Sequence, residues 1–443
     1  MTDVAAPVTF REALKFWFRL GCISFGGPAG QIALMHEELV VRRRWISEKR
    51  YLHALQYCML LPGPEAQQLA TYIGWLMHGT RGGIAAGALF VLPSLLLLIL
   101  LSWLYVAWGQ HPWAQAVLWG LKPAVTALVL QALHRMATRT LKARWLWGLA
   151  GIALLGTVWE VPFGLLILAA AATGYAMQRW AGAPSAAAPH APTGGNADAA
   201  GIRAWLDDHH TTPSHTQERL RTLVRTGALG FGLWAVTLGL IAAVFGLHHT
   251  LTRMGSFFTQ AALLTFGGAY AVLPYVTQAA VGQYGWLSAA QMMDGLALGE
   301  STPGPLIMVV AFVGFVGGYG QALLGHPLLG GIAAALVVTW FTFLPSFIFI
   351  LAGGPMVEST RHMPRLQGPL QGISAAVIGV MLHLAGIFAR QTWWPGGWHM
   401  PPDLMAMALT AVATWALVKK QFSVMQVLGG CTLAGLVWHL LRH

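Results

Sequence analysis

The chain has 443 residues, of which 56% are hydrophobic and only 9% are charged, whereas a soluble globular domain carries about 25% charged residues. Its 26 Lys and Arg outnumber its 15 Asp and Glu, but they stand at the ends of apolar segments rather than on one basic face, so we expect no nucleic-acid partner. This composition excludes a water-soluble enzyme and predicts an all-α polytopic membrane protein with the lipid bilayer around it.

The apolar segments form two similar series of predicted helices. In chain order, the first half predicts helices at 10–25 and 29–42 around a Gly-Gly-Pro break, and at 47–61 and 65–79 around a Pro-Gly-Pro break. Full spans follow at 83–108 and 113–137, and then a helical hairpin at 145–158 and 161–178. We expect a first membrane repeat at 1–179, a cytoplasmic flexible linker at 180–222, a connecting transmembrane helix at 223–247 and a second membrane repeat at 255–443.

The two halves match each other at fixed offsets. At an offset of 241 residues, Phe25-Gly26-Gly27 matches Phe266-Gly267-Gly268, and Pro62-Gly63-Pro64 matches Pro303-Gly304-Pro305. Farther along, an offset of 252 matches Leu92-Pro93-Ser94 to Leu344-Pro345-Ser346. An internal duplication of this kind is typical of secondary transporters.

Charge and helix count together predict that the second repeat is inverted. The connecting helix adds one crossing between two halves that each have an even number of elements. The stretch 42–50 carries Arg42, Arg43, Arg44, Lys49 and Arg50, whereas its counterpart at 283–291 has no Lys or Arg. By the positive-inside rule, the first loop, the N-terminus and the linker are cytoplasmic. We therefore expect two inverted-topology repeats of broken and full transmembrane helices, joined by one extra transmembrane helix, in the cell inner (plasma) membrane.

The duplicated breaks are the predicted substrate site. Pro cannot donate a hydrogen bond and Gly does not hold a helix, so each break frees backbone groups that need a partner at membrane depth. The N-terminus of a half-helix carries partial positive charge and favours an anion. Close helix packing is the alternative role for such glycines, but both breaks recur at the same separation. The predicted substrate-binding residues at the breaks are Phe25, Gly26, Gly27, Gly63, Pro64, Phe266, Gly267, Gly268, Ser301, Thr302 and Gly304.

A few charged residues inside apolar segments complete the predicted site. Lys122 lies ten residues into a span, and a cation there suits an anionic substrate. Glu65 follows Pro64 in the first turn of a half-helix, where the helix dipole favours a carboxylate, while burial favours its protonated form and makes it a candidate proton carrier. Glu300 is the second proton-coupling candidate and is preferred over Asp294, which lies six residues earlier on another face.

Two other groups of charges have interfacial interpretations. Arg19 lies on one helix face with Arg11 and Lys15, and it either anchors the helix at the interface or contacts the substrate; both roles stay open. Glu37 and Glu38 are expected to pair with the cluster Arg42 to Arg44.

Catalytic and metal-binding motifs are missing from the sequence. It contains no nucleophile elbow, HExxH or Walker sequence. Cys22, Cys58 and Cys431 have no paired spacing, and the histidines at 209, 210 and 215 lie in the polar linker, so we expect no metal and no cofactor. An integral-membrane enzyme using His134 and Glu300 on a lipid-linked substrate is the alternative from another functional class, and we expect a protein that is not an enzyme.

The motifs at the breaks are similar to those of the chromate ion transporter family. The matching residues are Ser24 to Pro28 with Gln31, the run Arg44-Trp45-Ile46-Ser47, and Leu61-Pro62-Gly63-Pro64-Glu65-Ala66-Gln67-Gln68, with counterparts in the second half. The resemblance covers nearly the whole chain except the linker and matches the long, two-domain form. Ala269 replaces the Pro28 position and Leu306 the Glu65 position in the second half, so the two halves are not equivalent.

The resemblance implies a secondary active transporter that exports chromate, a tetrahedral oxyanion, from the cytoplasm and confers chromate resistance. The driving force it implies is the membrane potential or a proton gradient, as in antiport. The residues alone indicate only an anion, and sulfate uptake or exchange stays open because sulfate is also a tetrahedral dianion. The oligomeric state stays open as well, a homodimer included.

Overall fold

The computed structural model describes residues 8–25, 27–180, 205–206, 219–266, 269–357, 367–420 and 422–442. Within these ranges the chain is helical, with one isolated β-bridge. Six helices are long and apolar enough to cross a membrane: α4 (Glu65–Trp108), α5 (Pro112–Thr140), α8 (Arg219–Phe245), α13 (Pro327–Val357), α14 (Gln367–Trp393) and α16 (Val424–Arg442). The predicted all-α polytopic class is confirmed.

The first repeat contains the predicted helices with small shifts of boundary. It comprises α1 (Phe10–Ile23), α2 (Gly27–His36), a π-helical turn η1 (Glu37–Arg42), α3 (Glu48–Leu60), α4, α5, α6 (Arg144–Val158) and α7 (Phe163–Trp180). The expected helices at 65–79 and 83–108 both belong to α4, which is interrupted by non-helical backbone at His78 and Gly79. Gly74 then lies against Gly82 and Ala86, so the two parts of α4 pack on each other as a hairpin.

The second repeat follows the same order. It comprises α9 (Thr250–Leu263), α10 (Ala269–Thr277), a π-helical turn η4 (Gln278–Gln283), α11 (Ala289–Ser301), η5 (Leu306–Met308), α12 (Val309–Gly320), η6 (Leu323–Gly325), α13, α14, α15 (Leu404–Val418) and α16. Its first helix begins at Thr250, a few residues before the expected start at Gly255. The turns η1 and η4 correspond residue for residue at the offset of 241, so the duplication extends to an irregular helical turn.

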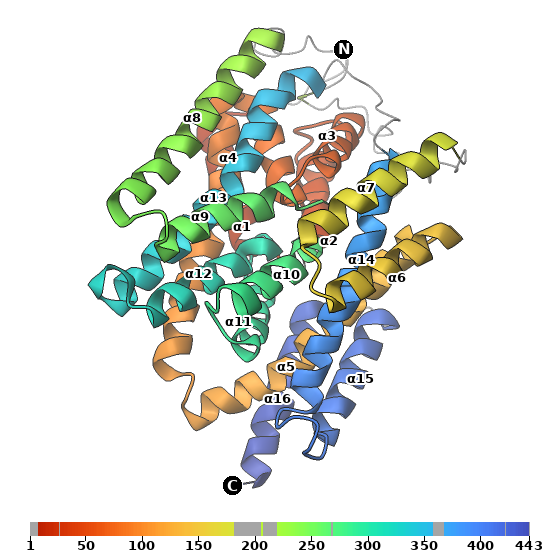
Figure 1. Cartoon of the computed structure of the whole chain (residues 1–443). Coiled ribbons are helices and arrows are strands. Elements are labelled where there is room, and N and C mark those ends of the chain that lie inside the picture. The colour runs from red at the N-terminus through yellow and green to blue at the C-terminus, as the bar shows by residue number, and fades with distance from the viewer. Residues whose placement is uncertain are drawn as a thin grey trace.

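Each repeat's terminal hairpin packs on a long helix of the other repeat. Figure 1 shows α6 and α7 alongside α14, and α15 and α16 alongside α5. The crossings use small residues: a Cβ on Gly174 of α7 would meet the backbone of Gly372 on α14, and one on Gly435 of α16 would meet the backbone of Gly120 on α5. Small residues of this kind let helices approach closely within a membrane. The hairpins therefore tie the two repeats together reciprocally.

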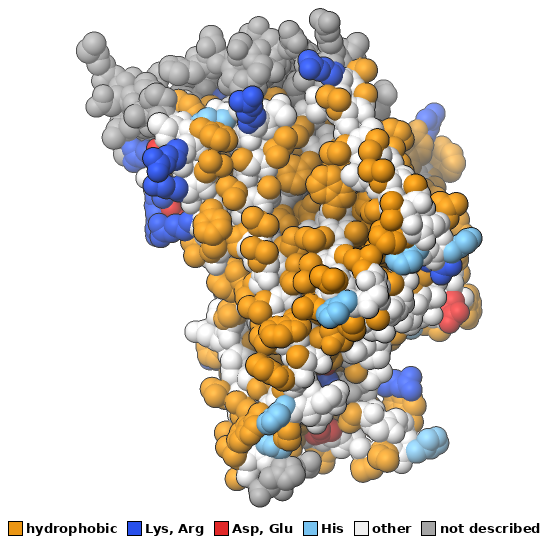
Figure 2. All heavy atoms as spheres, turned by 90° about the vertical axis from the view of Figure 1, so that its left-hand side faces the viewer, with side chains coloured by type: hydrophobic (Ala, Val, Ile, Leu, Met, Phe, Trp, Pro, Cys, Tyr) orange, Lys and Arg blue, Asp and Glu red, His pale blue; other side chains and the backbone are white. Residues whose placement is uncertain are grey.

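Apolar side chains cover the outside of the helices. No residue in the apolar stretch of α8 is buried in the isolated chain. Leu229, Phe231 and Val244 each expose more than 60% of their surface. Figure 2 shows apolar side chains spread over the middle of one face, with Lys and Arg gathered mainly toward its upper end. An exposed apolar band of this extent is unusual for a soluble monomer and fits contact with lipid.

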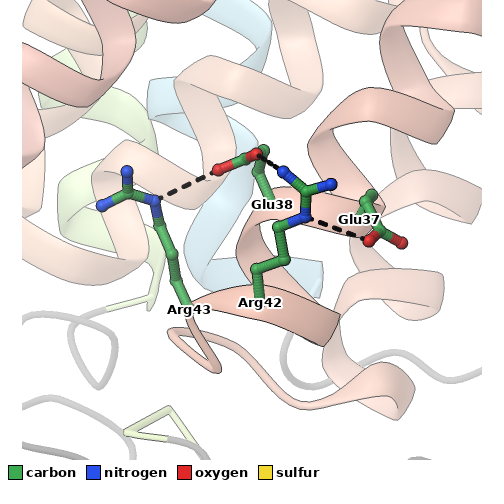
Figure 3. Close-up of polar contacts among 4 residues, drawn as sticks. All are labelled: Glu37, Glu38, Arg42 and Arg43. Carbon is green, nitrogen blue, oxygen red and sulfur yellow. Dashed lines mark hydrogen bonds and ion pairs between the residues drawn. The ribbon is translucent and has the colours of Figure 1, made fainter.

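The predicted pairing of Glu37 and Glu38 with the following arginines is confirmed (Figure 3). Arg42 contacts Glu37 at 3.2 Å and Glu38 at 3.0 Å, and Arg43 contacts Glu38 at 3.4 Å. Arg42 is largely exposed, so these ion pairs contribute little to stability. Arg11, Lys15 and Arg19 are also exposed on one side of α1, which fits the interfacial role for Arg19.

Two residues of the predicted linker dock on the first repeat. The backbone N–H of Trp205 donates to the carbonyl of Arg44, that of Leu206 donates to Trp45, and that of Ser47 donates to Leu206, each at 3.1 Å. Leu206 is buried in this short parallel bridge. Burial of the apolar Leu206 side chain favours this docking. Most of the linker, with its three clustered histidines, lies outside the described residues.

Candidate functional site

The four helix breaks meet in reciprocal pairs between the repeats. The backbone N–H of Gly63 donates to the carbonyl of Thr265 at 2.8 Å, and the N–H of Gly304 donates to the carbonyl of Ser24, also at 2.8 Å. Gly63 and Gly304 correspond at the offset of 241, and so do Ser24 and Thr265. Each Pro-Gly-Pro break is therefore held by the residue before the Phe-Gly-Gly break of the other repeat, as a two-fold axis would arrange it.

The same reciprocity governs the packing around the two glycines. A Cβ on Gly63 would collide with Oγ of Ser346, and a Cβ on Gly304 would lie 2.6 Å from Cβ of Ser94. Ser94 and Ser346 correspond at the offset of 252, and both are fully buried. Gly63 and Gly304 also have φ angles of 127° and 107°, which residues other than glycine rarely adopt. Glycine is required at both positions by backbone conformation and by space.

These contacts change the role of two predicted donors. Because the N–H groups of Gly63 and Gly304 already bond across the repeats, they are not available to a ligand in this conformation. The first turn of α4, in contrast, begins at Glu65 and leaves N–H groups without a helical partner. The first backbone hydrogen bond of this helix is donated by the N–H of Gln68 to the carbonyl of Pro64, at 2.9 Å. Free backbone donors are thus expected just after the break.

Buried amide side chains of Gln31 and Gln68 lie at the crossing, and Gln67 lies next to Gln68 on α4 with its Nε2 donating to Oγ1 of Thr71 at 3.0 Å. Gln31, Gln67 and Gln68 expose at most 1% of their surface. Nε2 of Gln31 donates to the carbonyls of Gly304 and Ser24, and Nε2 of Gln68 donates to the carbonyl of Pro62 at 2.8 Å and to Oγ of Ser346 at 3.4 Å. Gln31 therefore bonds directly to the other repeat's break. The sequence feature that could have pointed to these three glutamines is their position inside the motifs shared with the chromate ion transporter family.

This amide cluster is incompletely satisfied. Oε1 of Gln31, Gln67 and Gln68 and Oγ of Ser94 are buried without a hydrogen-bond partner among the described residues. Buried polar atoms are normally paired, because each unpaired one costs about 1–3 kcal/mol. An amide also offers two N–H donors and can turn to present them. The crossing therefore holds spare polar capacity, which water or a polar ligand can use.

The predicted proton-coupling residues lie near the breaks but in different surroundings. Glu65 is half-buried in the first turn of α4. Glu300 is buried near the end of α11, and its Oε1 accepts a 2.6 Å hydrogen bond from the hydroxyl of Tyr270 on α10. The hydroxyls of Ser301 and Thr302 donate to carbonyls of their own helix, those of Leu298 and Gly299. These two hydroxyls therefore cap the end of α11.

The remaining predicted site residues are more scattered. Phe25 exposes 38% of its surface, Phe266 is half-buried, and Gly27 begins α2 with a φ of 70°. Pro64 is buried and precedes α4. Lys122 is half-buried on α5, which packs on α11. Gly26, Gly267 and Gly268 lie outside the described residues. The structure therefore brings Gly63 and Gly304 to the crossing, whereas no contact of Lys122 with the crossing is seen among the described residues.

An all-helical, multi-pass membrane protein built from two matching halves has the architecture of a transporter. The family model for chromate transporters matches residues 11–175 and 252–436. The chain therefore belongs to the chromate transporter family.

Two long relatives align over almost the whole chain. The chromate transport protein of Pseudomonas aeruginosa is 31% identical over 98% of this chain and 93% of its own length. The chromate transport protein of Cupriavidus metallidurans is 27% identical over 99% and 96%. The uncharacterized transporter YwrA of Bacillus subtilis is 30% identical over 35% of this chain but 89% of its own length. That relative is therefore a chain of about the length of one repeat. No solved structure matches the chain.

Proposed function

We propose that this protein exports chromate from the cytoplasm, driven by the proton gradient or the membrane potential, and so confers chromate resistance. Two observations support the proposal. Long relatives are named chromate transport proteins, and the helix breaks of the two repeats meet around buried polar side chains with unused hydrogen-bonding capacity. The second observation carries the argument, because an oxyanion crossing an apolar bundle needs such groups at its centre.

We assign the oxyanion to the crossing of the breaks. The partial positive charge and free N–H groups at the start of α4 face this region, and the amides of Gln67 and Gln68 extend from the same turns. Gly63 and Gly304 shape the loops rather than donate, since their N–H groups are bonded between the repeats. Glu65 and Glu300 are the proposed proton carriers, and Lys122 supplies compensating charge for a dianion because each helix end supplies only about half a unit.

We further propose that the repeats are inverted, with the two-fold axis in the membrane plane. The basic cluster at 42–50, paired in part with Glu37 and Glu38, would face the cytoplasm, and its neutral counterpart at 283–291 would face outward. The N-terminus and the linker would then be cytoplasmic and the protein a multi-pass component of the inner membrane. Alternating access follows if the two repeats rock about the crossing.

The test is chromate flux in liposomes that contain only the purified protein. Outwardly directed chromate gradients, with imposed membrane potential or pH difference, should give flux well above that of protein-free liposomes. Excess sulfate on the substrate side measures the preference between the two dianions. Flux of sulfate without any flux of chromate would replace chromate by sulfate as substrate. The absence of both fluxes would overturn the transporter function and favour an enzyme acting on a lipid-linked substrate.

A further inference from the structure

An open groove lies where α6 of the first repeat packs on α14 of the second. Its volume of about 480 Å³ is within the range of about 300–1,000 Å³ that ligand sites occupy. Leu154 of α6 lines it together with residues of the C-terminal part of α14, from Leu382 onward. Closer to the start of α14 the two helices touch, because a Cβ on Gly379 would collide with the carbonyl of Ala150. The groove therefore lies beside a contact between the repeats.

One end of the groove is charged and aromatic, and the other end is apolar. At the first end, Arg390 is exposed in the last turn of α14, and its guanidinium carbon lies 5.7 Å from the ring centroid of Trp398. Trp398 lies 4.9 Å from the ring of Trp394, and clustered tryptophans are typical of the membrane–water interface. At the other end, Leu382 exposes 46% of its surface, about 12 Å along the helix from Arg390. A phospholipid has the same order of polarity, from headgroup to acyl chain.

The guanidinium of Arg390 has no carboxylate partner among the described residues. Asp403 lies near this end of α14, since its N–H donates to the carbonyl of Trp393 at 2.8 Å. Its carboxylate, however, accepts hydrogen bonds from Nε1 of Trp119 and from the N–H of Ala406, both at 3.0 Å. The charge of Arg390 is therefore left to an external anion. A guanidinium matches the geometry of a phosphate, which it can bind through two parallel hydrogen bonds.

The missing side chain at Gly386 keeps the apolar part of the groove open. Gly386 lines the groove between Leu382 and Arg390, and a Cβ there would meet nothing within 4 Å. His383 also lines the groove, on the same face of α14 as Arg390 and two turns deeper. It offers a hydrogen-bonding group to the ester region of a lipid. Lipid tails contact all of the outer surface, so the charge at one end is what makes this groove selective.

We propose that this groove binds one anionic phospholipid, of the phosphatidylglycerol type, with its phosphate on Arg390 and an acyl chain over Gly386. The lipid contacts both α6 and α14, so its binding stabilises the association of the two repeats. A zwitterionic lipid carries a cation next to its phosphate, which Arg390 repels, and it binds more weakly. The inference is independent of the transported substrate.

The test is native mass spectrometry of the purified full-length protein in detergent, titrated separately with phosphatidylglycerol and with phosphatidylcholine of the same acyl chains. The wild type should bind its first phosphatidylglycerol about tenfold more tightly than its first phosphatidylcholine. Arg390→Gln removes the charge and should bind the two lipids equally. Gly386→Phe fills the apolar part of the groove and should lose the tight binding of phosphatidylglycerol.

Two variants outside the groove serve as matched controls. Arg253 is an exposed arginine on α9, and a Cβ on Gly429 of α16 would meet nothing within 4 Å. Arg253→Gln and Gly429→Phe should bind both lipids as the wild type does. In thermal unfolding, phosphatidylglycerol should stabilise the wild type and both controls more than it stabilises Arg390→Gln or Gly386→Phe.

Three results would overturn the inference. The first is equal affinity of the wild type for the two lipids, which would leave Arg390 as an interfacial anchor. The second is wild-type binding of phosphatidylglycerol in Arg390→Gln or in Gly386→Phe; if one of these variants does not fold, the other decides. The third is equal stabilisation of the wild type by inorganic phosphate alone, which would make the site one for a free ion. Absence of chromate flux would overturn only the proposed transport function.

Discussion

Replacing Gly63 by alanine should damage the junction between the repeats far more than an ordinary glycine substitution. The new Cβ would lie 2.6 Å from Nε2 of Gln68 and would collide with Oγ of Ser346, and the backbone has a φ of 127°. Backbone strain of this kind costs about 1–3 kcal/mol, and overpacking of a buried site costs about 1–3 kcal/mol more. The expected loss of stability is therefore about 2–6 kcal/mol, a large part of a typical total.

Gly79 provides the matched control. It also has a positive φ, of 62°, but a Cβ there would meet nothing within 4 Å. Gly79 has a ψ of −156°, a backbone region that glycine alone adopts readily, so Gly79→Ala should cost backbone strain of about 1–3 kcal/mol without any overpacking. Gly304→Ala should behave like Gly63→Ala, because its Cβ would lie 2.6 Å from Cβ of Ser94 in the reciprocal contact.

The assay is thermal unfolding of the purified variants in detergent, followed by tryptophan fluorescence, together with chromate flux in liposomes. Gly63→Ala and Gly304→Ala should both unfold well below Gly79→Ala and should lose flux. Equal unfolding temperatures for all three variants, with flux retained, would refute the close crossing of the breaks. A loss confined to one of the two crossing glycines would refute its reciprocity.

Three further predictions concern topology, proton coupling and the amide cluster. In a cysteine-free background, a cysteine at position 47 should resist an impermeant external thiol reagent whereas one at position 288 should react; equal labelling from one side would contradict inversion. Glu65→Gln mimics the protonated carboxyl, so chromate flux should stay high and lose its pH dependence, and an unchanged profile would remove Glu65 as proton carrier. Gln68→Leu should weaken chromate binding at least tenfold, since it removes amide donors at the crossing; wild-type affinity in dialysis would remove this side chain from the site.

The amino-acid sequence determines the local structure of this protein. Apolar length defines the spans, and Pro-Gly-Pro ends α3 and begins α4 because its residues cannot continue a helix. The pairing of Arg42 with Glu38 also follows from sequence, since residues four apart share a helix face. The duplication is equally visible, and the matching turns η1 and η4 agree with it. Inversion and the identity of the anion-binding residues stay predictions.

Only the tertiary structure decides which surfaces of the two repeats meet. Periodicity specifies which face of a helix is apolar, but not that Gly174 crosses Gly372 or that Gly63 bonds to Thr265. Those contacts depend on how the halves pack, which is a long-range choice among many apolar faces of similar hydrophobicity. For the same reason the roles of Glu300 and Lys122 at the breaks stay predictions. Packing of α5, α12 and α16 on α11 was equally invisible in the sequence, and it buries Asp294, a carboxylate that retains an unsatisfied oxygen among the described residues.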